Sequence, residues 1–186
     1  MQINRPKSED DLDRVLRSST SLASAGKFAE ALAICAWLIE DADTEVAGLR
    51  QSAAVKQQMH DVNGAIQDLQ KVVTLFPHEP ADFYFLGILL LKNGSTTDSI
   101  HAFSAAIKAD AEAESVYYTE PALLFRAEAN LKVCNYEEAI ADVSSLRPGF
   151  KTHISGSGMR SKEQIFNEAT EALARKSKFK FKSSLK

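Results

Sequence analysis

One interval in the sequence constrains the fold more than any other feature, because small residues recur 34 positions apart. They are Ala31, Ala65 and Ser99, and a fourth small residue, Ala139, follows after 40 positions. Four segments align around them: GKFAEALAICAWLIE, HDVNGAIQDLQKVVTLFP, GSTTDSIHAFSAAIKAD and CNYEEAIADVSSLRP. A repeated unit of this length fits a pair of helices joined by a turn, which stacks on copies of itself. The interval therefore predicts a repeat array.

The residues within the repeats favour helices throughout. Apolar residues recur at helical spacing, as at Leu12, Val15 and Leu16, and alternation with a period of two is nearly absent. Ser161 followed by Gln164 is typical of the start of a last helix. We predict an all-α chain of nine helices, two in each repeat and one that caps the array, with no sheet.

The repeats resemble those of the tetratricopeptide repeat family over residues 12–150. The third copy is closest to the family pattern, with Leu86 and Gly87 at the hallmark pair and Gly94 at the turn. The resemblance implies a right-handed superhelical solenoid with a C-terminal capping helix. The expected boundaries are an array at 1–150 with repeats at 12–45, 46–79, 80–113 and 120–150, a linker at 151–160, a capping helix at 161–176 and a basic tail at 177–186.

The longer interval before the fourth copy places six extra residues within the segment 110–121. Insertions in solenoids project on one face and are often used for binding. Two interpretations stay open: the segment binds a partner, or it is a longer connection that packs on itself.

Charge is distributed unevenly along the chain. The net charge is −3, but residues 175–186 carry six Lys and Arg residues and no acid, so the remaining 16 basic and 25 acidic residues sum to −9. An acidic body argues against general nucleic-acid binding, which needs a basic face. The interleaved Lys and Phe of the tail have two interpretations, contact with anionic lipid or nucleic acid and a solvated, frayed end.

Other features bear on the compartment. The longest apolar run, 83–91, has nine residues, whereas a span of the bilayer takes about 20. The first residues, MQINRPKSEDD, contain no apolar stretch, so no secretory signal is expected. Only two cysteines occur, which favours a reducing setting. We expect a cytoplasmic protein without stable membrane insertion.

No set of residues predicts catalysis. An enzyme needs a convergent acid, base or nucleophile with groups that fix its geometry. His60, His78, His101 and His153 have no His or Cys partner at metal-ligand spacing. The string GSGMRS at 156–161 lacks the strand and the lysine of a phosphate-binding loop, so it predicts a flexible link. We expect no enzymatic activity, no cofactor and no metal.

The resemblance also implies where a partner binds. In the family, the first helix of each repeat forms a concave wall along which the partner lies. Tyr84 is the only aromatic residue on this predicted wall, so we expect it to contribute most to binding. The last helix either packs around Ile140 and Val143 and leaves the groove open, as we expect, or folds over the wall. The expected partner-binding residues are Arg50, Gln57, Tyr84, Ile88, Leu91, Lys92, Leu124, Glu128, Leu131 and Lys132.

For function, the resemblance implies a protein–protein interaction module. Some family members clamp the acidic tails of heat-shock chaperones, but the residues of that clamp are replaced here by Leu16, Thr20, Gln51, Ala81 and Phe85. The chain also resembles small stand-alone bacterial repeat proteins, some of which are immunity or adaptor proteins for secreted toxins. The alternative is a secretion chaperone or assembly scaffold that holds an extended segment of an exported protein. The expected partner is thus a protein, such as a toxin or secreted effector, and not a nucleic acid.

Overall fold

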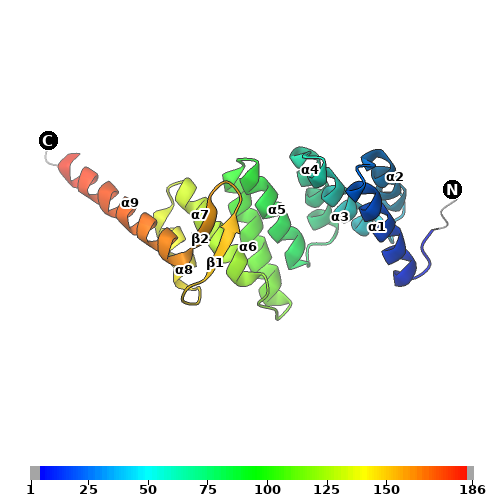
Figure 1. The fold of residues 1–186 in the computed structure, drawn as a ribbon. Coiled ribbons are helices and arrows are strands. Elements are labelled where there is room, and N and C mark those ends of the chain that lie inside the picture. Colours follow the sequence, from blue (N-terminus) through cyan, green and yellow to red (C-terminus); the bar gives the residue numbers. More distant parts are fainter. Residues whose placement is uncertain (1–4, 184–186) are drawn as a thin grey trace. The chain divides into compact units, whose positions relative to one another are not determined.

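The structure, a computed structural model, describes residues 5–183, with side chains up to Ser177. The chain forms two compact units, Met1–Pro77 and His78–Lys186. Each unit contains two helical hairpins, and the second unit also contains a small sheet and a last helix (Figure 1). The predicted all-α class is confirmed, since the described residues form nine helices in successive hairpins.

In the described part of the chain, eight helices form the four hairpins. Their helices are α1 (Glu9–Ser24), α2 (Phe28–Ile39), α3 (Glu45–Gln58), α4 (Val62–Leu75), α5 (Pro80–Lys92), α6 (Thr96–Glu112), α7 (Thr119–Lys132) and α8 (Tyr136–Ser144).

Small side chains allow close packing within the hairpins of the N-terminal unit. Ala31 and Ala65, which define the 34-residue interval, are fully buried. Ser19 is buried as well, and its hydroxyl donates a hydrogen bond of 3.2 Å to the carbonyl of Ala31, so its polar atom is satisfied. Cys35 lies in the core, and burial raises the pKa of its thiol.

The closest approach in the C-terminal unit is between α5 and α6. Gly87 faces the ring of Phe103, and a methyl group placed at Gly87 would lie 2.6 Å from the ring Cε1 atom. This is well inside van der Waals contact, and Phe103 is fully buried and has little room to move. The hallmark glycine therefore sets the spacing of the two helices.

Each hairpin turns through one residue with a positive φ angle. Gly26 and Gly94 have φ of 75° and 83°, and the equivalent residues of the other two hairpins, His60 and Cys134, both have φ of 62°. Such angles are uncommon for residues with a Cβ atom. The four hairpins thus share one turn geometry, although two of them lack the glycine.

Residues 151–161 differ from the expected flexible link and from the expected absence of a sheet. They form an antiparallel hairpin of β1 (Lys151–Ile154) and β2 (Gly158–Ser161). Gly156 and Gly158 have φ of 83° and 76°, which lets the chain reverse direction over a few residues. Ile154 is buried and anchors the hairpin to the repeats. The linker predicted at 151–160 is therefore a folded element.

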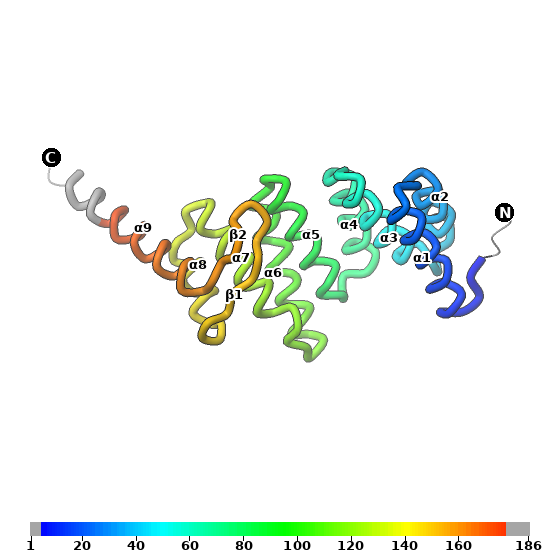
Figure 2. Tube along the Cα trace, viewed as in Figure 1, coloured from blue at the N-terminus to red at the C-terminus, as the bar shows by residue number. Residues whose placement is uncertain are grey.

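The last helix, α9 (Lys162–Ser183), begins at the predicted capping box. The backbone N–H of Gln164 donates to Ser161 Oγ at 3.2 Å, and that of Ser161 donates to Gln164 Oε1 at 2.9 Å. Ile165 and Ala169 are buried against α8, which confirms that the helix packs on the second helix of the last repeat. Figure 2 shows the path from α8 through the β hairpin into α9.

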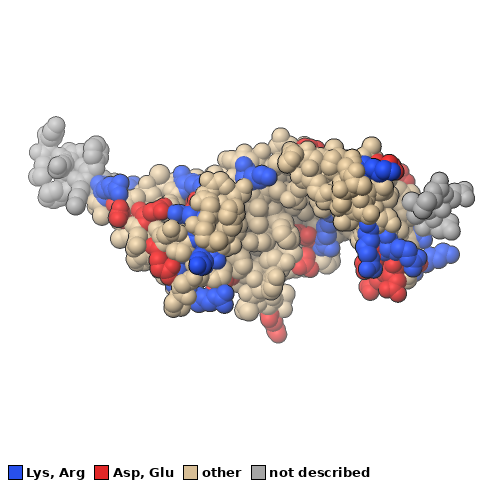
Figure 3. Space-filling view, in the orientation of Figure 1, with Lys and Arg blue, Asp and Glu red and all other residues tan. Residues whose placement is uncertain are grey.

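The helix continues past its predicted end at residue 176. Its backbone is helical to Ser183, whereas residues 184–186 of the predicted basic tail lie outside the described residues, as do the side chains from 178 onward. On the face drawn in Figure 3, Lys and Arg side chains lie next to Asp and Glu side chains over the hairpin and the start of α9.

Candidate functional site

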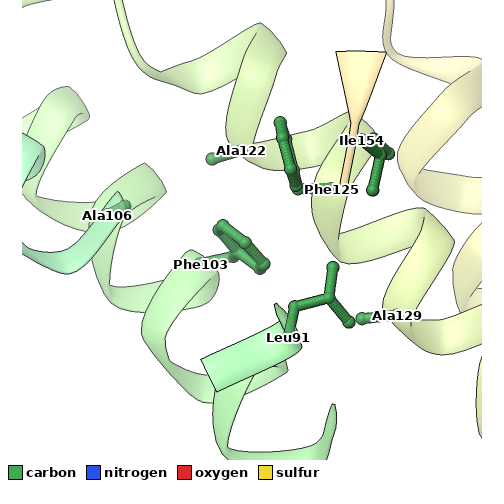
Figure 4. Packing of buried hydrophobic residues seen from close by; sticks show 7 residues of the cluster. All are labelled: Leu91, Phe103, Ala106, Ala122, Phe125, Ala129 and Ile154. Atoms are coloured by element: carbon green, nitrogen blue, oxygen red, sulfur yellow. The ribbon is translucent and has the colours of Figure 1, made fainter. Parts of the chain in front are cut away.

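The β hairpin packs on α7, the helix that supplies the fourth repeat's part of the predicted groove wall. Ile154 of β1 packs in one cluster with Leu91 of α5 and with Phe125 and Ala129 of α7 (Figure 4). A segment of the chain itself thus occupies part of the predicted groove. The structure combines the two alternatives, because the hairpin covers part of the wall, and α9, which packs mainly on α8, also packs against the wall residues Leu124 and Leu131 of α7.

A buried ion pair holds the hairpin on the wall. Glu128 of α7 is only 4% exposed, and it accepts hydrogen bonds from Ser157 Oγ at 2.6 Å and from Arg160 Nε at 2.9 Å. The two terminal nitrogens of Arg160 bind both carboxylate oxygens of Glu168, at 2.7 and 2.8 Å. These bonds from Arg160 lower the pKa of Glu168, and Glu168 together with Glu128 raises the pKa of Arg160.

The structure separates the ten predicted groove residues into several environments. Leu91, Leu124 and Glu128 are buried, and Leu131 packs against the cluster between α8 and α9. Leu91, Leu124 and Glu128 therefore have little area to offer a partner, so that part of the prediction conflicts with the packing, whereas Leu131 is only partly buried. The residues that keep exposed area are Tyr84, Ile88, Lys92 and Lys132 in the C-terminal unit and Arg50 and Gln57 on α3 of the other unit.

Four aromatic rings of the C-terminal unit lie next to one another, and two of them are well exposed. We call this set the aromatic surface: Tyr84, Phe85, Tyr117 and Tyr118. The ring of Tyr118 lies 5.3 Å from Tyr84, 6.5 Å from Phe85 and 4.9 Å from Tyr117, measured between centroids. Phe85 is 48% exposed and Tyr117 is 76% exposed. The aromatic surface therefore joins α5 to the insertion before α7.

A buried carboxylate fixes the insertion in place. Asp110 Oδ2 accepts hydrogen bonds from the backbone N–H groups of Tyr118 and Thr119, at 3.0 and 2.8 Å, and from Thr119 Oγ1 at 2.7 Å. The insertion is thus tied to the end of α6, while Val116 and Tyr117 at its tip face solvent. The insertion therefore packs on its own repeat, and partner binding through its exposed Tyr117 stays a prediction.

Tyr84 belongs partly to the core. Its ring lies 6.1 Å from Phe103 and 5.7 Å from Phe125, and burial, followed by the neighbouring Tyr118 and Tyr117, raises its pKa to about 12. Its role in packing is therefore larger than its place on the predicted wall suggests. Phe85, one position away, carries more accessible ring area and was not among the predicted residues.

A second hollow lies in the N-terminal unit between α1 and α2, with a volume of about 1450 Å³ and Trp37 in its lining. The three arginines of its lining, Arg5, Arg14 and Arg17, are paired with acids. Arg5 Nη1 lies 2.7 Å from Asp41, and Arg14 Nη1 lies 3.3 Å from Asp11. Because these charges are already neutralised and the large exposed rings lie elsewhere, the aromatic surface is the stronger candidate.

Two searches of the described residues bear on other kinds of site. No group of three or more His, Cys, Asp or Glu residues in this part of the chain is placed to hold a metal ion. None of the helices in the same part is long and apolar enough to cross a membrane.

Arg160→Gln is expected to loosen the hairpin while the repeats stay folded. The change removes the hydrogen-bonded guanidinium from the buried Glu128 and leaves it with the more distant Lys132 Nζ at 4.0 Å. Breaking a buried pair costs about 3–5 kcal/mol. Hydrogen exchange of residues 151–161 should lose at least tenfold in protection, with α5 and α6 unchanged. Arg175→Gln, which removes only an exposed pair with Glu171, is the control. Unchanged protection of the hairpin in Arg160→Gln would contradict this assignment.

The same contact predicts a pH dependence. Because the pKa of Glu168 is lowered in the folded state, its contribution is present above the ordinary glutamate pKa of about 4.3 and is lost as the pH falls through the lower folded value. Protection of the hairpin should therefore decrease on acidification below about pH 4, and Glu168→Gln should remove most of that decrease.

Comparison with known proteins supports the fold. No family model matches the sequence, and no curated protein matches it. The solved structure of MamA protein is 20% identical over 90% of this chain and 94% of its own, with a TM-score of 0.63. A tetratricopeptide repeat protein from Parabacteroides merdae is 16% identical over 75% of this chain and 52% of its own, with a TM-score of 0.57. A putative kinesin light chain from Podosopora anserina, with nearly identical TPR-like repeats, is 14% identical over 93% of this chain and 92% of its own, with a TM-score of 0.63. The chain has the tetratricopeptide-repeat fold that its sequence motifs imply.

Proposed function

We propose that the chain is a non-enzymatic protein-interaction module whose aromatic surface contacts the partner. The observation that carries this proposal is the exposure of Phe85 and Tyr117 within a contiguous group of four rings. Soluble proteins bury most large aromatic side chains, and exposed apolar patches of this kind mark interaction sites. Tyr and Phe in such patches also tend to dominate the energy of protein interfaces.

The position of the hairpin supports the same site. Since Ile154 and the Glu128–Arg160 pair fill the wall of α7, the aromatic surface is what remains for a partner on this face. The aromatic surface consists of four rings, so it can contact a few side chains of a partner. The exposed residues of the predicted groove next to it, Ile88 and Lys92, extend it along α5.

Two partner classes give this module a cellular role in the bacterial cytoplasm. One is a secreted toxin, for which the chain would be an immunity or adaptor protein. The acidic body, with its charge of −9 outside the last twelve residues, is complementary to a basic toxin domain. The other is an exported protein, one extended segment of which the chain would hold before secretion.

A photo-crosslinking experiment in the native host tests the proposal. A benzoylphenylalanine placed at Phe85 is expected to crosslink one protein, which mass spectrometry identifies. The matched control is the same group at Phe166, which is 40% exposed on α9, outside the aromatic surface. A folded toxin domain favours the immunity role, and an exported protein bound through an extended segment favours the chaperone role. Equal crosslinking at both positions, or none at Phe85, would overturn the proposed site.

A further inference from the structure

We propose that the aromatic surface of one copy binds residues 178–186 of a second copy. This inference rests on the proposed function, because it takes the same surface as a protein-binding site and names its partner. The argument has three parts: the chemistry of the surface, the chemistry of the segment and the direction in which α9 runs.

The aromatic surface combines ring faces with negative charge. Burial and the neighbouring Tyr117 raise the pKa of Tyr118, and so do the carboxylates of Glu79, Asp110 and Asp82. Glu79 is half-buried, whereas Asp110 and Asp82 are buried, so these two contribute negative potential at the rings and no accessible oxygen. Asp110 is fully buried, and its Oδ1 atom has no hydrogen-bond partner although Oδ2 accepts three bonds. Ring faces and carboxylates both attract cations, and they attract most strongly a cation that brings apolar area with it.

The segment 178–186 has the complementary composition. Its sequence, KFKFKSSLK, contains four lysines, two phenylalanines and no acid. The phenylalanines match the exposed rings of Phe85 and Tyr117, since aromatic pairs stabilise contacts beyond the area that they bury. The lysines match the negative potential of the carboxylates beneath and beside the rings, and the rest of the chain offers no other run of this kind.

The direction of α9 indicates that the segment bound by the aromatic surface comes from a second copy. Ile165 and Ala169 fix the helix on α8, and Lys176 Nζ lies 5.7 Å from the centroid of the Tyr136 ring. Within the C-terminal unit, α9 leads from α8 away from α5, so the two ends of the unit are separated by α6, α7 and α8 (Figure 1). The helical backbone at 178–183 therefore leads away from α5 of the same copy. Because the surface and the segment are different patches, the contact is head-to-tail and can propagate from copy to copy.

A labelled synthetic peptide of residues 176–186 tests the contact directly by fluorescence anisotropy with the full chain. We expect saturable binding that weakens as salt is raised, because exposed charges contribute. Phe85→Ser with Tyr117→Ser should weaken binding at least tenfold, whereas Phe166→Ser should leave it within twofold. Both altered rings are well exposed, and thermal unfolding followed by circular dichroism verifies that the double variant is folded.

Sedimentation velocity of the full chain at increasing concentration tests the same contact between copies. We expect the weight-average sedimentation coefficient to rise with concentration. The variant with Lys178, Lys180 and Lys182 each changed to Glu should lose that rise, and the variant with the exposed Lys7, Lys27 and Lys71 changed to Glu should keep it. Equal binding of the peptide to the double variant, no binding at 1 mM peptide, or association unaffected by the tail changes would each overturn the inference.

The two proposals fail in different ways. A crosslink from position 85 to another protein, together with no self-association, overturns the second copy as partner and leaves the interaction site standing. A crosslink from position 85 to residues 178–186 of the chain itself supports both. No crosslink to any protein overturns both.

Discussion

Gly87→Leu is expected to unfold the C-terminal unit. A Cβ atom alone at this position would lie 2.6 Å from the ring of the fully buried Phe103, and a leucine adds three more carbons to the same space. Overpacking a core costs about 1–3 kcal/mol and more when the neighbour cannot move. Urea unfolding followed by circular dichroism measures the decrease in the free energy of unfolding.

Ala111→Leu is the matched control, because Ala111 is exposed on α6 in the same unit. It should shift the midpoint very little. A Gly87→Leu midpoint equal to that of the wild type would mean that the assigned repeat register, with Gly87 at the helix crossing, is wrong.

Arg126→Ala is expected to produce the second large loss of stability. Arg126 Nε and Nη2 donate to the two carboxylate oxygens of Asp142, at 3.0 and 2.5 Å, and Nη1 donates to Ser104 Oγ at 2.9 Å. The arginine thus ties α7 to both α6 and α8. Its removal leaves the buried Asp142 without a cation, which costs about 3–5 kcal/mol. The free energy of unfolding from urea titration checks this.

Arg14→Ala is the control, because it removes an arginine that is not part of a buried ion pair. Arg14 is exposed and pairs with Asp11 on the same helix, and exposed pairs contribute about 0–1 kcal/mol. The double variant with Asp142→Leu should recover part of the loss, because no buried charge remains without a partner. Similar small losses for Arg126→Ala and Arg14→Ala would contradict the role of the buried pair.

The repeat hairpins are the part of the fold that the sequence predicts well. Ala31, Ala65 and Ser99 lie where two helices touch, so the same small size is required at each copy and the interval is visible in one sequence. The start of α9 is equally local, because Ser161 and Gln164 satisfy each other's backbone groups. Both features can be recognised in one sequence, because the capping box involves residues three positions apart and the small residues recur at a fixed interval.

The β hairpin and the accessible site depend on contacts between distant residues, and local patterns do not contain them. Each strand has four residues, which is too short for a clear alternation, and the glycines of the turn also suit a flexible link. Its stability comes from Ile154 and from Arg160, which meets Glu128, 32 positions earlier in the chain. Phe85 is not among the predicted groove residues, although it stands at a position of the family's chaperone clamp, and only its packing next to Tyr118 shows that it belongs to a larger surface.

The claim that the aromatic surface binds a protein is tested most directly by the Kd of the partner identified at position 85. Isothermal titration calorimetry compares the wild type with the Phe85→Ser, Tyr117→Ser double variant and with Phe166→Ser. Exposed rings at the centre of an interface contribute about 2 kcal/mol or more, so the Kd of the double variant should rise at least about 30-fold. The Kd of Phe166→Ser should stay within twofold of the wild type. A double variant that binds the partner as tightly as the wild type would contradict the claim.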